Sequence, residues 1–194
     1  MFTGIITAVG KVEDVSRKKN SIYLRISTPP KWKLKLGGSV AVDGICSTVK
    51  RIRRGSFEVE YMPETVKKTT AKFFKKGTPV NLEQPLRMND RLDGHLVQGH
   101  IDMRGEILDI RKLGNSVILK IGFPARYQKF IAEKGAIAVN GVSLTVVATS
   151  KSSFTVSLVS YTLAHTNLRY LKKSDKVNLE IDMLARYLDA LKRK

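Results

Sequence analysis

The chain has 194 residues, with 35 lysines and arginines against 17 aspartates and glutamates, so its formal net charge is +18. Hydrophobic residues make up 42% of it, a globular composition that excludes a disordered or collagen-like chain. The single cysteine excludes an intrachain disulfide and a cysteine-rich zinc site. No apolar run reaches the roughly 18 residues of a membrane-spanning helix.

The positive charge is scattered in short clusters such as residues 50–54 and 75–76. No motif with base-stacking aromatic residues accompanies these clusters, so we interpret them as a solvated basic surface rather than a nucleic-acid site. An anionic small molecule or an acidic partner is the alternative. The N-terminal segment lacks the pattern of a signal peptide, and we expect a cytoplasmic protein with no membrane contact.

The first half of the chain is predicted to consist mainly of short strands. Residues 21–26 and 56–61 alternate apolar and polar side chains with a period of two. Asp43-Gly44 lies between two apolar runs, which predicts a hairpin turn. One short helix is expected at residues 63–74. About six short strands per half predict a small closed barrel, since closure removes exposed strand edges.

The second half repeats the first. Residues 39–49 (SVAVDGICSTV) match residues 136–146 (AIAVNGVSLTV), and VNLE at 80–83 recurs at 177–180, both at an offset of 97 positions. The period is half the chain length, so we expect a duplicated unit with domains of residues 1–95 and about 96–194.

Asn140-Gly141 predicts a second hairpin turn, and the second short helix is expected at residues 123–134 or 160–171. The tail carries apolar residues at the spacing of one helical face, which predicts an amphipathic helix too short to be stable alone. This face packs either within the chain or between subunits. Its residues are Leu184, Tyr187, Leu188 and Leu191.

Each copy offers one nucleophilic side chain beside a hydroxyl. Cys46 and Thr48 are two residues apart on a predicted strand and therefore share a face. Ser143 and Thr145 occupy the same places in the second copy. The alternative for Cys46 is a small buried hydrophobic residue.

Two histidines lie where the copies join, in the segment 94–101 (GHLVQGHI). A spacing of five places His95 and His100 on neither one helix face nor one strand face, so a shared metal is not expected. Each is either a site residue or a hydrogen-bonded junction residue. Asp182 ends the second VNLE strand, where the first copy has Pro85, and it either caps the tail helix or belongs to a site.

Several segments resemble, in order and spacing, the riboflavin synthase family of the duplicated, trimeric type. GHLVQGHI together with an N-terminal MFTGI is highly specific for that family, and the resemblance covers nearly the whole chain. Departures are Ser47 where leucine is usual, a missing proline before Tyr161, and Arg186 in place of lysine. The matching segments are residues 1–6, 39–49, 62–65, 94–101, 141–145, 178–182 and 185–187.

The resemblance implies an all-β fold of two tandem six-stranded Greek-key β-barrels plus a C-terminal α-helix. The barrels would be lumazine-binding domains of residues 1–95 and 96–182, and residues 183–194 would form a trimerisation helix. In this family the N-terminal barrel of one subunit faces the C-terminal barrel of a neighbour. The expected partners are therefore two further copies of the chain, with a lumazine synthase as an additional candidate.

The implied reaction is a dismutation. One molecule of 6,7-dimethyl-8-ribityllumazine transfers a four-carbon unit to a second, which gives riboflavin and 5-amino-6-ribitylamino-2,4(1H,3H)-pyrimidinedione. No cofactor and no metal is implied. The alternative is a non-catalytic lumazine- or flavin-binding relative, which keeps the barrels but loses site residues.

The resemblance also implies roles for individual residues. Those expected at the chemistry are Cys46, His100, Ser143, Asp182 and Ser39. Those expected to contact substrate, largely through backbone groups, are Phe2, Thr3, Gly4, Ile5, Ile6, Ser47, Thr48, Glu60, Tyr61, Met62, Pro63, Glu64, Thr65, Gly99, Ile101, Lys134, Leu144, Thr145, Ser157, Leu158, Val159, Ser160, Tyr161 and Thr162.

Overall fold

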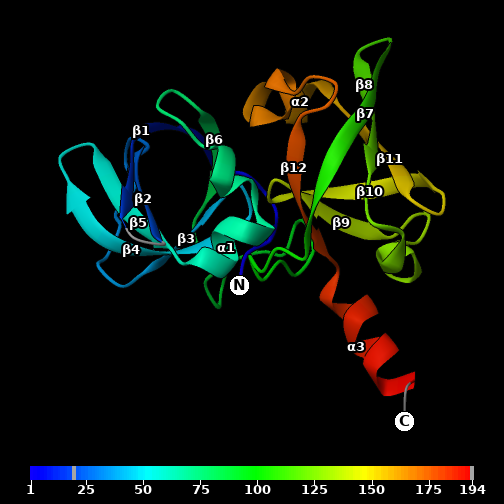
Figure 1. Ribbon diagram of the computed structural model, residues 1–194, viewed down its shortest axis with the longest axis horizontal. Helices are drawn as coiled ribbons and strands as arrows, with labels where there is room; N and C mark the ends of the chain where they lie inside the picture. Colours follow the sequence, from blue (N-terminus) through cyan, green and yellow to red (C-terminus); the bar gives the residue numbers. More distant parts are fainter. Residues whose placement is uncertain (19–20, 193–194) are drawn as a thin grey trace.

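The computed structural model describes residues 1–18 and 21–192, which form two closed antiparallel barrels side by side (Figure 1). In the first barrel the strands neighbour one another in the order β1-β2-β5-β4-β3-β6, and in the second in the order β7-β8-β11-β10-β9-β12. The two topologies are therefore the same, and the predicted pair of six-stranded barrels is confirmed. The first six strands are β1 (Ala8–Lys18), β2 (Ser21–Ser27), β3 (Ser39–Val42), β4 (Ile45–Arg53), β5 (Ser56–Tyr61) and β6 (Pro79–Glu83). The next six are β7 (Met103–Leu113), β8 (Ser116–Gly122), β9 (Ala136–Val139), β10 (Val142–Thr149), β11 (Ser153–Leu158) and β12 (Lys176–Ile181).

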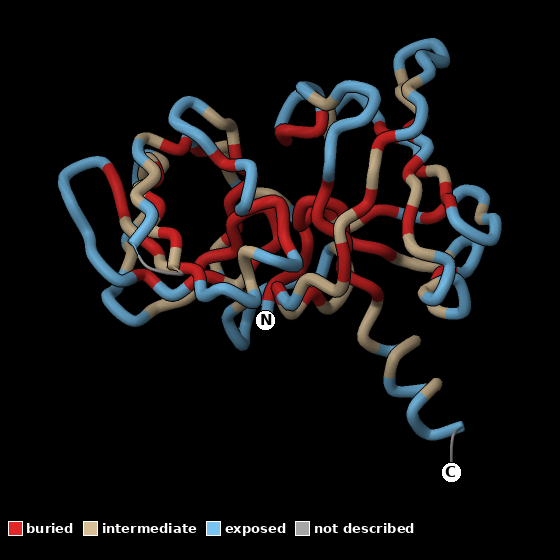
Figure 2. Tube along the Cα trace, in the orientation of Figure 1, coloured by how far each residue is buried: buried red, intermediate tan, exposed pale blue. Residues whose placement is uncertain are grey.

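Each barrel encloses its own apolar core. The period of two in β2 places Ile22, Leu24 and Ile26 inside the first barrel, between half-buried polar neighbours. Phe57 in β5 and Phe154 in β11 are equivalent at the offset of 97, and both are almost fully buried. Figure 2 shows the buried residues inside each barrel and along the junction between the barrels.

Both predicted hairpin turns are confirmed. Asp43 and Gly44 have φ angles of 47° and 77°, and Asn140 and Gly141 have 46° and 79°. Two consecutive residues with positive φ are the requirement of a tight hairpin turn that follows the strand twist. A Cβ on Gly44 would lie 2.7 Å from the backbone nitrogen of Gly141, so the two turns are packed back to back.

A short helical segment follows β5 and β11 in the same way. The first consists of α1 (Pro63–Lys68) and η1 (Thr70–Phe73), the second of α2 (Ser160–His165) and η3 (Asn167–Tyr170). The second copy therefore places its helix at the later of the two predicted positions. The earlier position holds only the 3-10 turn η2 (Ala125–Phe130).

The C-terminal helix α3 (Met183–Lys192) leads away from the second barrel (Figure 1). Arg186 binds the Asp102 carboxylate at 2.9 Å, and Lys129 binds Asp189 at 2.7 Å, so the helix is tied to the barrel through ion pairs. Ala185 packs against the core of the second barrel, but the predicted apolar face of the helix does not pack within the chain. Its residues Leu184, Tyr187, Leu188 and Leu191 are each at least 56% exposed. Residues 193–194 of the expected helix lie outside the described part of the chain.

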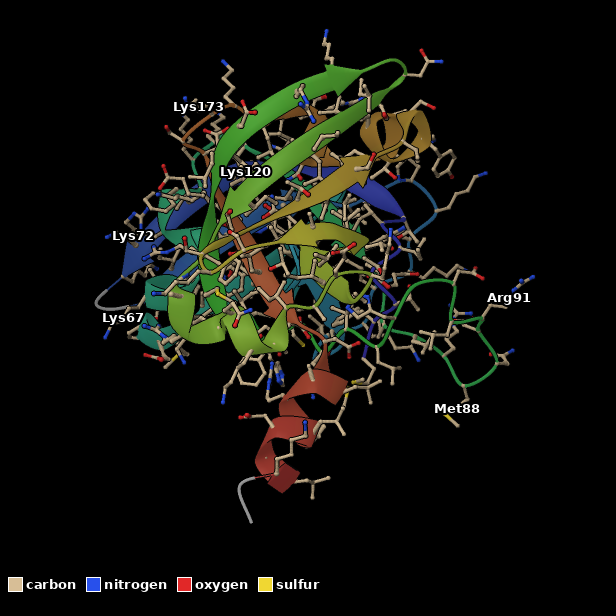
Figure 3. All side chains as sticks on the ribbon, turned by 90° about the vertical axis from the view of Figure 1, so that its right-hand side faces the viewer. Lys67, Lys72, Met88, Arg91, Lys120 and Lys173 are labelled. Atoms are coloured by element: carbon tan, nitrogen blue, oxygen red, sulfur yellow. The ribbon has the colours of Figure 1, made fainter. Side chains whose placement is uncertain are left out.

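Basic side chains extend from several elements rather than from one patch. Figure 3 shows Lys67, Lys72, Lys120 and Lys173 along one side of the molecule and Arg91 on the opposite side. Across the part of the chain that the structure covers, no helix is long and apolar enough to cross a membrane.

Candidate active site

Two equivalent segments cross between the barrels. We call residues 1–6 the first arm and residues 94–101 the second arm. Phe2 and Val97 form a β-bridge, with backbone hydrogen bonds of 2.7 and 3.0 Å in the two directions. Beyond this bridge, Ile6 of the first arm packs against the core of the second barrel, whereas Ile101 of the second arm packs against the core of the first. Each arm therefore serves the barrel of the other copy.

Each arm places a glycine against the candidate nucleophile of the other barrel. The Cys46 backbone N–H donates to the Gly99 carbonyl over 2.8 Å, and the Ser143 N–H donates to the Gly4 carbonyl over the same distance. Both glycines have positive φ, and a Cβ on either would lie within 2.7 Å of the Cβ of Cys46 or Ser143. Only glycine fits such a close approach, which explains why both arms carry a strong sequence signal.

A buried glutamate holds each arm. Glu83 accepts the N–H groups of Thr3 and Gly4, at 2.6 and 3.1 Å. Glu180, its equivalent in the second copy, accepts the N–H groups of Gln98 and Gly99, at 2.6 and 2.9 Å. Burial raises the pKa of the Glu180 carboxyl to about 7, against the lowering effect of the two N–H donors. The last residue of each VNLE repeat, Glu83 or Glu180, thus holds one arm in place.

The first barrel presents its candidate residues on the outer face of β4. Cys46 is half-buried and Thr48 exposed, with the buried residues Ile45, Ser47 and Val49 on either side of them. Ser39 in β3 pairs directly with Thr48 across the sheet. The structure therefore brings Cys46, Thr48 and Ser39 together on one outer face.

The second barrel presents the equivalent face with a histidine added. Ser143 is half-buried and Thr145 exposed on β10. The His95 imidazole Nδ1 lies 2.7 Å from Ser143 Oγ, and the backbone N–H of His95 donates to the Thr3 carbonyl over 3.1 Å. Burial lowers the pKa of His95, while the charge of Asp182 acts in the opposite direction. Burial therefore favours the neutral form of an imidazole that lies beside a hydroxyl, a pairing typical of proton transfer.

His95, which the family resemblance did not place at the chemistry, contacts the candidate nucleophile Ser143. The expected catalytic role of His100 stays a prediction. His100 is exposed and directly follows Gly99, the residue against Cys46. Asp182 Oδ1 accepts the Leu184 N–H over 3.0 Å, so it caps α3, and its charge also reaches His95. The cap and a place near the site coexist in this residue.

Four of the expected substrate contacts have their side chains in the barrel cores. Ser47 Oγ lies 2.7 Å from the Tyr61 hydroxyl inside the first barrel, and burial raises the pKa of Tyr61. Leu144 and Leu158 belong to the core of the second barrel. Only the backbone of these four residues can therefore serve the outer faces.

The helical segments after β5 and β11 carry most of the remaining expected contact residues. Neither α1 nor α2 receives a side-chain cap from its N-cap residue, Met62 or Val159. The other expected contact residues here are surface groups: Pro63, Glu64, Ser157, Ser160 and Tyr161 are exposed, and Thr65 and Thr162 are half-buried. Lys134, also exposed, has a φ of 64° and donates its N–H to the Val146 carbonyl near the end of the β9–β10 pair. Ile5, likewise exposed, lies in the first arm.

The two faces differ in charge. On the first barrel Glu60 accepts the Tyr23 hydroxyl over 2.7 Å and forms an ion pair with Lys50. This pairing lowers the pKa of Glu60, chiefly through the Lys50 hydrogen bond. The equivalent of Glu60 in the second copy is Ser157, and the equivalent of Lys50 is Val147. Among the described residues, no group of three or more histidine, cysteine, aspartate or glutamate side chains is arranged to hold a metal ion.

Both barrels match the Lumazine binding domain family, over residues 3–85 and 98–182. The fold and the paired outer faces thus define a protein with two lumazine-binding domains. Riboflavin synthases of Brucella abortus, Actinobacillus pleuropneumoniae and Bacillus subtilis are 41%, 39% and 37% identical to this chain. The alignments cover 96–97% of this chain and 96%, 88% and 88% of those proteins. The chain belongs to the riboflavin synthase family of enzymes.

Solved structures share this fold. The crystal structure of LumP complexed with riboflavin has a TM-score of 0.88, at 23% identity and over 93% of this chain and 99% of that one. The complex of LumP with 6,7-dimethyl-8-(1'-D-ribityl) lumazine has a TM-score of 0.86 with the same identity and coverage. At this identity the likeness supports the architecture alone.

Proposed function

We propose that each outer face binds one molecule of 6,7-dimethyl-8-ribityllumazine and that two such molecules react with each other. The observation that carries the proposal is the matched pair of faces, Cys46 with Thr48 and Ser143 with Thr145, each supported by the arm of the other copy. Two identical substrates require two similar sites, which a duplicated barrel supplies directly. LumP, of the same fold, binds this lumazine and riboflavin in its crystal structures.

The reaction needs no external oxidant. One lumazine loses a four-carbon unit and becomes the pyrimidinedione, and the other gains it and becomes riboflavin. Atoms and electrons therefore balance between the two substrates. The protein has to orient the two rings and move protons. Holding two reactants in place lowers the activation barrier of their bimolecular reaction by up to roughly 7–11 kcal/mol in ideal cases.

The differences between the two faces support different roles for their residues. The His95 imidazole would take a proton from the lumazine bound at the second barrel, through the Ser143 hydroxyl. Burial favours the neutral imidazole, which lies within hydrogen-bond distance of Ser143 Oγ. Cys46 would serve the first barrel as a nucleophile or proton carrier. Ser39 and Thr48 would orient the ring there, and Asp182 would support the charge of His95 during transfer.

The remaining contacts would surround the two rings and their ribityl chains. The half-buried and exposed members of the two helical segments would bind from one side and the arms from the other. His100, exposed beside Gly99, would lie at the edge of the first-barrel site. Core residues such as Tyr61 and Leu158 would contribute backbone groups only.

A homotrimer would complete the sites. Apolar side chains of α3 that are unpacked within the chain are available for a helix bundle between three copies. The first barrel of one copy would then face the second barrel of its neighbour, in a ring of three heterologous contacts. A cytoplasmic location and an association with a lumazine synthase are proposed on the family resemblance.

Purified protein incubated with 6,7-dimethyl-8-ribityllumazine alone tests the proposal. Absorbance should show one riboflavin formed for every two lumazines consumed, with no cofactor added. Binding without turnover would instead identify a non-catalytic lumazine-binding relative. In the Cys46→Ser variant, turnover should fall far more than lumazine binding, and equal turnover would remove Cys46 from the mechanism.

A further inference from the structure

A cavity of about 530 Å³ lies between the barrels, at a place unrelated to the outer faces of β4 and β10. Its walls come from both copies, and all but one of the lining residues form pairs at the offset of 97. Equivalent residues of the two copies therefore line the cavity in pairs. The pairs are Asp43 with Asn140, Thr70 with Asn167, Phe73 with Tyr170, Phe74 with Leu171, Thr78 with Asp175 and Pro79 with Lys176.

The floor is a rigid polar junction made by the two back-to-back hairpin turns. The Asn167 side-chain N–H donates to Asp43 Oδ1 over 2.8 Å, and the Asn178 side-chain N–H donates to the Asp43 carbonyl over 2.9 Å. From the other copy, the Asn81 side-chain N–H donates to the Asn140 carbonyl over 3.0 Å. These hydrogen bonds join the barrels, so the floor is fixed before any ligand binds.

Two side-chain atoms of residues that line the cavity are buried without a hydrogen-bond partner. They are Thr70 Oγ1 and Asn167 Oδ1, on residues that are each 6% exposed. A buried polar atom left unpaired costs about 1–3 kcal/mol, and such atoms are rare in folded proteins. An amide oxygen can only accept, so the junction next to the cavity leaves acceptor capacity unused.

The floor also carries a carboxylate. Asp43 is 3% exposed, and among the described residues no lysine, arginine or histidine forms an ion pair with it. Its partners are the Asn81 backbone N–H and the Asn167 amide, both uncharged, and burial raises its pKa to about 7. At the rim, Lys176 is paired with Glu106. A ligand that brings positive charge to the floor would therefore meet an unpaired carboxylate.

The walls above the floor are aromatic. Phe73 and Tyr170 are half exposed at the cavity, and Phe74 is buried. The volume lies in the range of small-molecule sites, which are mostly apolar with a few convergent polar groups. We propose that this inter-barrel cavity binds a small planar aromatic amidine. Its N–H groups meet the Asp43 carboxylate, and its ring packs against Phe73 and Tyr170.

Benzamidine and benzamide form the matched probe pair, because they share the ring and differ in the charge of the head group. Titration calorimetry of the full chain measures both. A charge-assisted hydrogen bond contributes about 1.5–3 kcal/mol, so benzamidine should bind about tenfold or more tightly than benzamide. Equal affinities, or no benzamidine binding at millimolar concentration, would overturn the proposal.

Asp43→Asn is the decisive variant, because the second copy already has asparagine at this place with the same φ. It should abolish the preference for benzamidine over benzamide, whereas Asp109→Asn, an exposed residue on β7, should leave that preference unchanged. Retention of the preference in Asp43→Asn would overturn the proposal. If Asp43→Asn does not fold, Tyr170→Ala at the half-exposed rim replaces it, and unchanged affinity for both probes would count against the site. A crystal soaked in benzamidine that shows only water in the cavity would also exclude it.

Discussion

The backbone N–H of Cys46 donates to the carbonyl of Gly99, 53 positions further along the chain, over 2.8 Å. The same bond joins Ser143 to Gly4. Each barrel therefore shows its candidate nucleophile on a strand that the other copy supports. This crossing makes the paired sites depend on the duplication as a whole, because neither barrel alone contains both the strand and its arm.

The close approach of Gly99 to Cys46 predicts a large effect of one added methyl group. Gly99→Ala should destabilise the protein and lower turnover, because the new Cβ would lie 2.7 Å from the Cys46 Cβ at a φ of 81°. Urea unfolding and the riboflavin assay measure the two effects. Gly55→Ala is the matched control, with a φ of 76° and no atom within 4 Å of the added Cβ. Equal losses in both variants would assign the effect to backbone strain alone.

The contact between His95 and Ser143 predicts a catalytic loss without a folding defect. His95→Asn should lower turnover by roughly 10²-fold or more, the usual contribution of a positioned acid or base. Asp109→Asn, at an exposed position on β7, should leave turnover unchanged. Turnover at the wild-type level in His95→Asn would exclude a proton-transfer role, and a comparable loss in His100→Asn would restore His100 as a second candidate.

The buried Asp43 carboxyl predicts a stability that falls as pH rises. Its folded-state pKa of about 7 exceeds the ordinary value of 3.8, so the folded chain holds this proton more firmly than the unfolded chain does. The contribution is therefore full below about pH 4 and is lost as pH rises through about 7.

The Asp43→Asn variant should flatten this dependence by removing one titrating group. Urea midpoints at about pH 5 and about pH 8 would show a smaller difference in the variant than in the wild type. Glu180, with a pKa also raised to about 7, contributes in the same direction, so some dependence persists. An identical pH dependence in both proteins would show that Asp43 is not a stability-linked titrating group.

The exposed apolar face of α3 predicts that the tail controls assembly. Replacing Leu184 and Leu188 by serine should convert a trimer into monomers in sedimentation velocity, because both side chains are about 60% exposed within the chain. Deletion of residues 183–194 should have the same result. Lys192→Ser, on the same helix, is the control and should keep the trimer. A trimer that survives both changes would assign assembly to the barrels instead.

Local sequence signals predicted the turns and strands well. Asp43-Gly44 and Asn140-Gly141 encode the hairpin backbone directly, and the alternation in residues 56–61 gave the bounds of β5. The equivalence of the copies also implied two barrels of one topology. Turns and strand alternation are determined by residues close together in the sequence, so the sequence alone predicts them.

Long-range contacts were harder to foresee. His95 meets Ser143 across 48 positions, through an arm whose crossing depends on how the barrels dock. Of the two predicted positions for the second helix, the structure has the one after β11, where α2 and η3 correspond to α1 and η1 after β5. The side chain of Ser47 proved to face the core beside Tyr61, because the alternation of β4 places it opposite to Cys46. The repeat at an offset of 97 shows which residues are equivalent, but only the docking of the barrels brings the equivalent pairs together around the cavity.

The central claim is that one chain carries two matched sites. Equilibrium titration with riboflavin, the product, measures the number of sites without turnover. The account predicts two riboflavin molecules bound per chain, with one affinity altered by a substitution at Thr48 and the other by a substitution at Thr145. A single riboflavin per chain, or one affinity that responds to both substitutions, would contradict it.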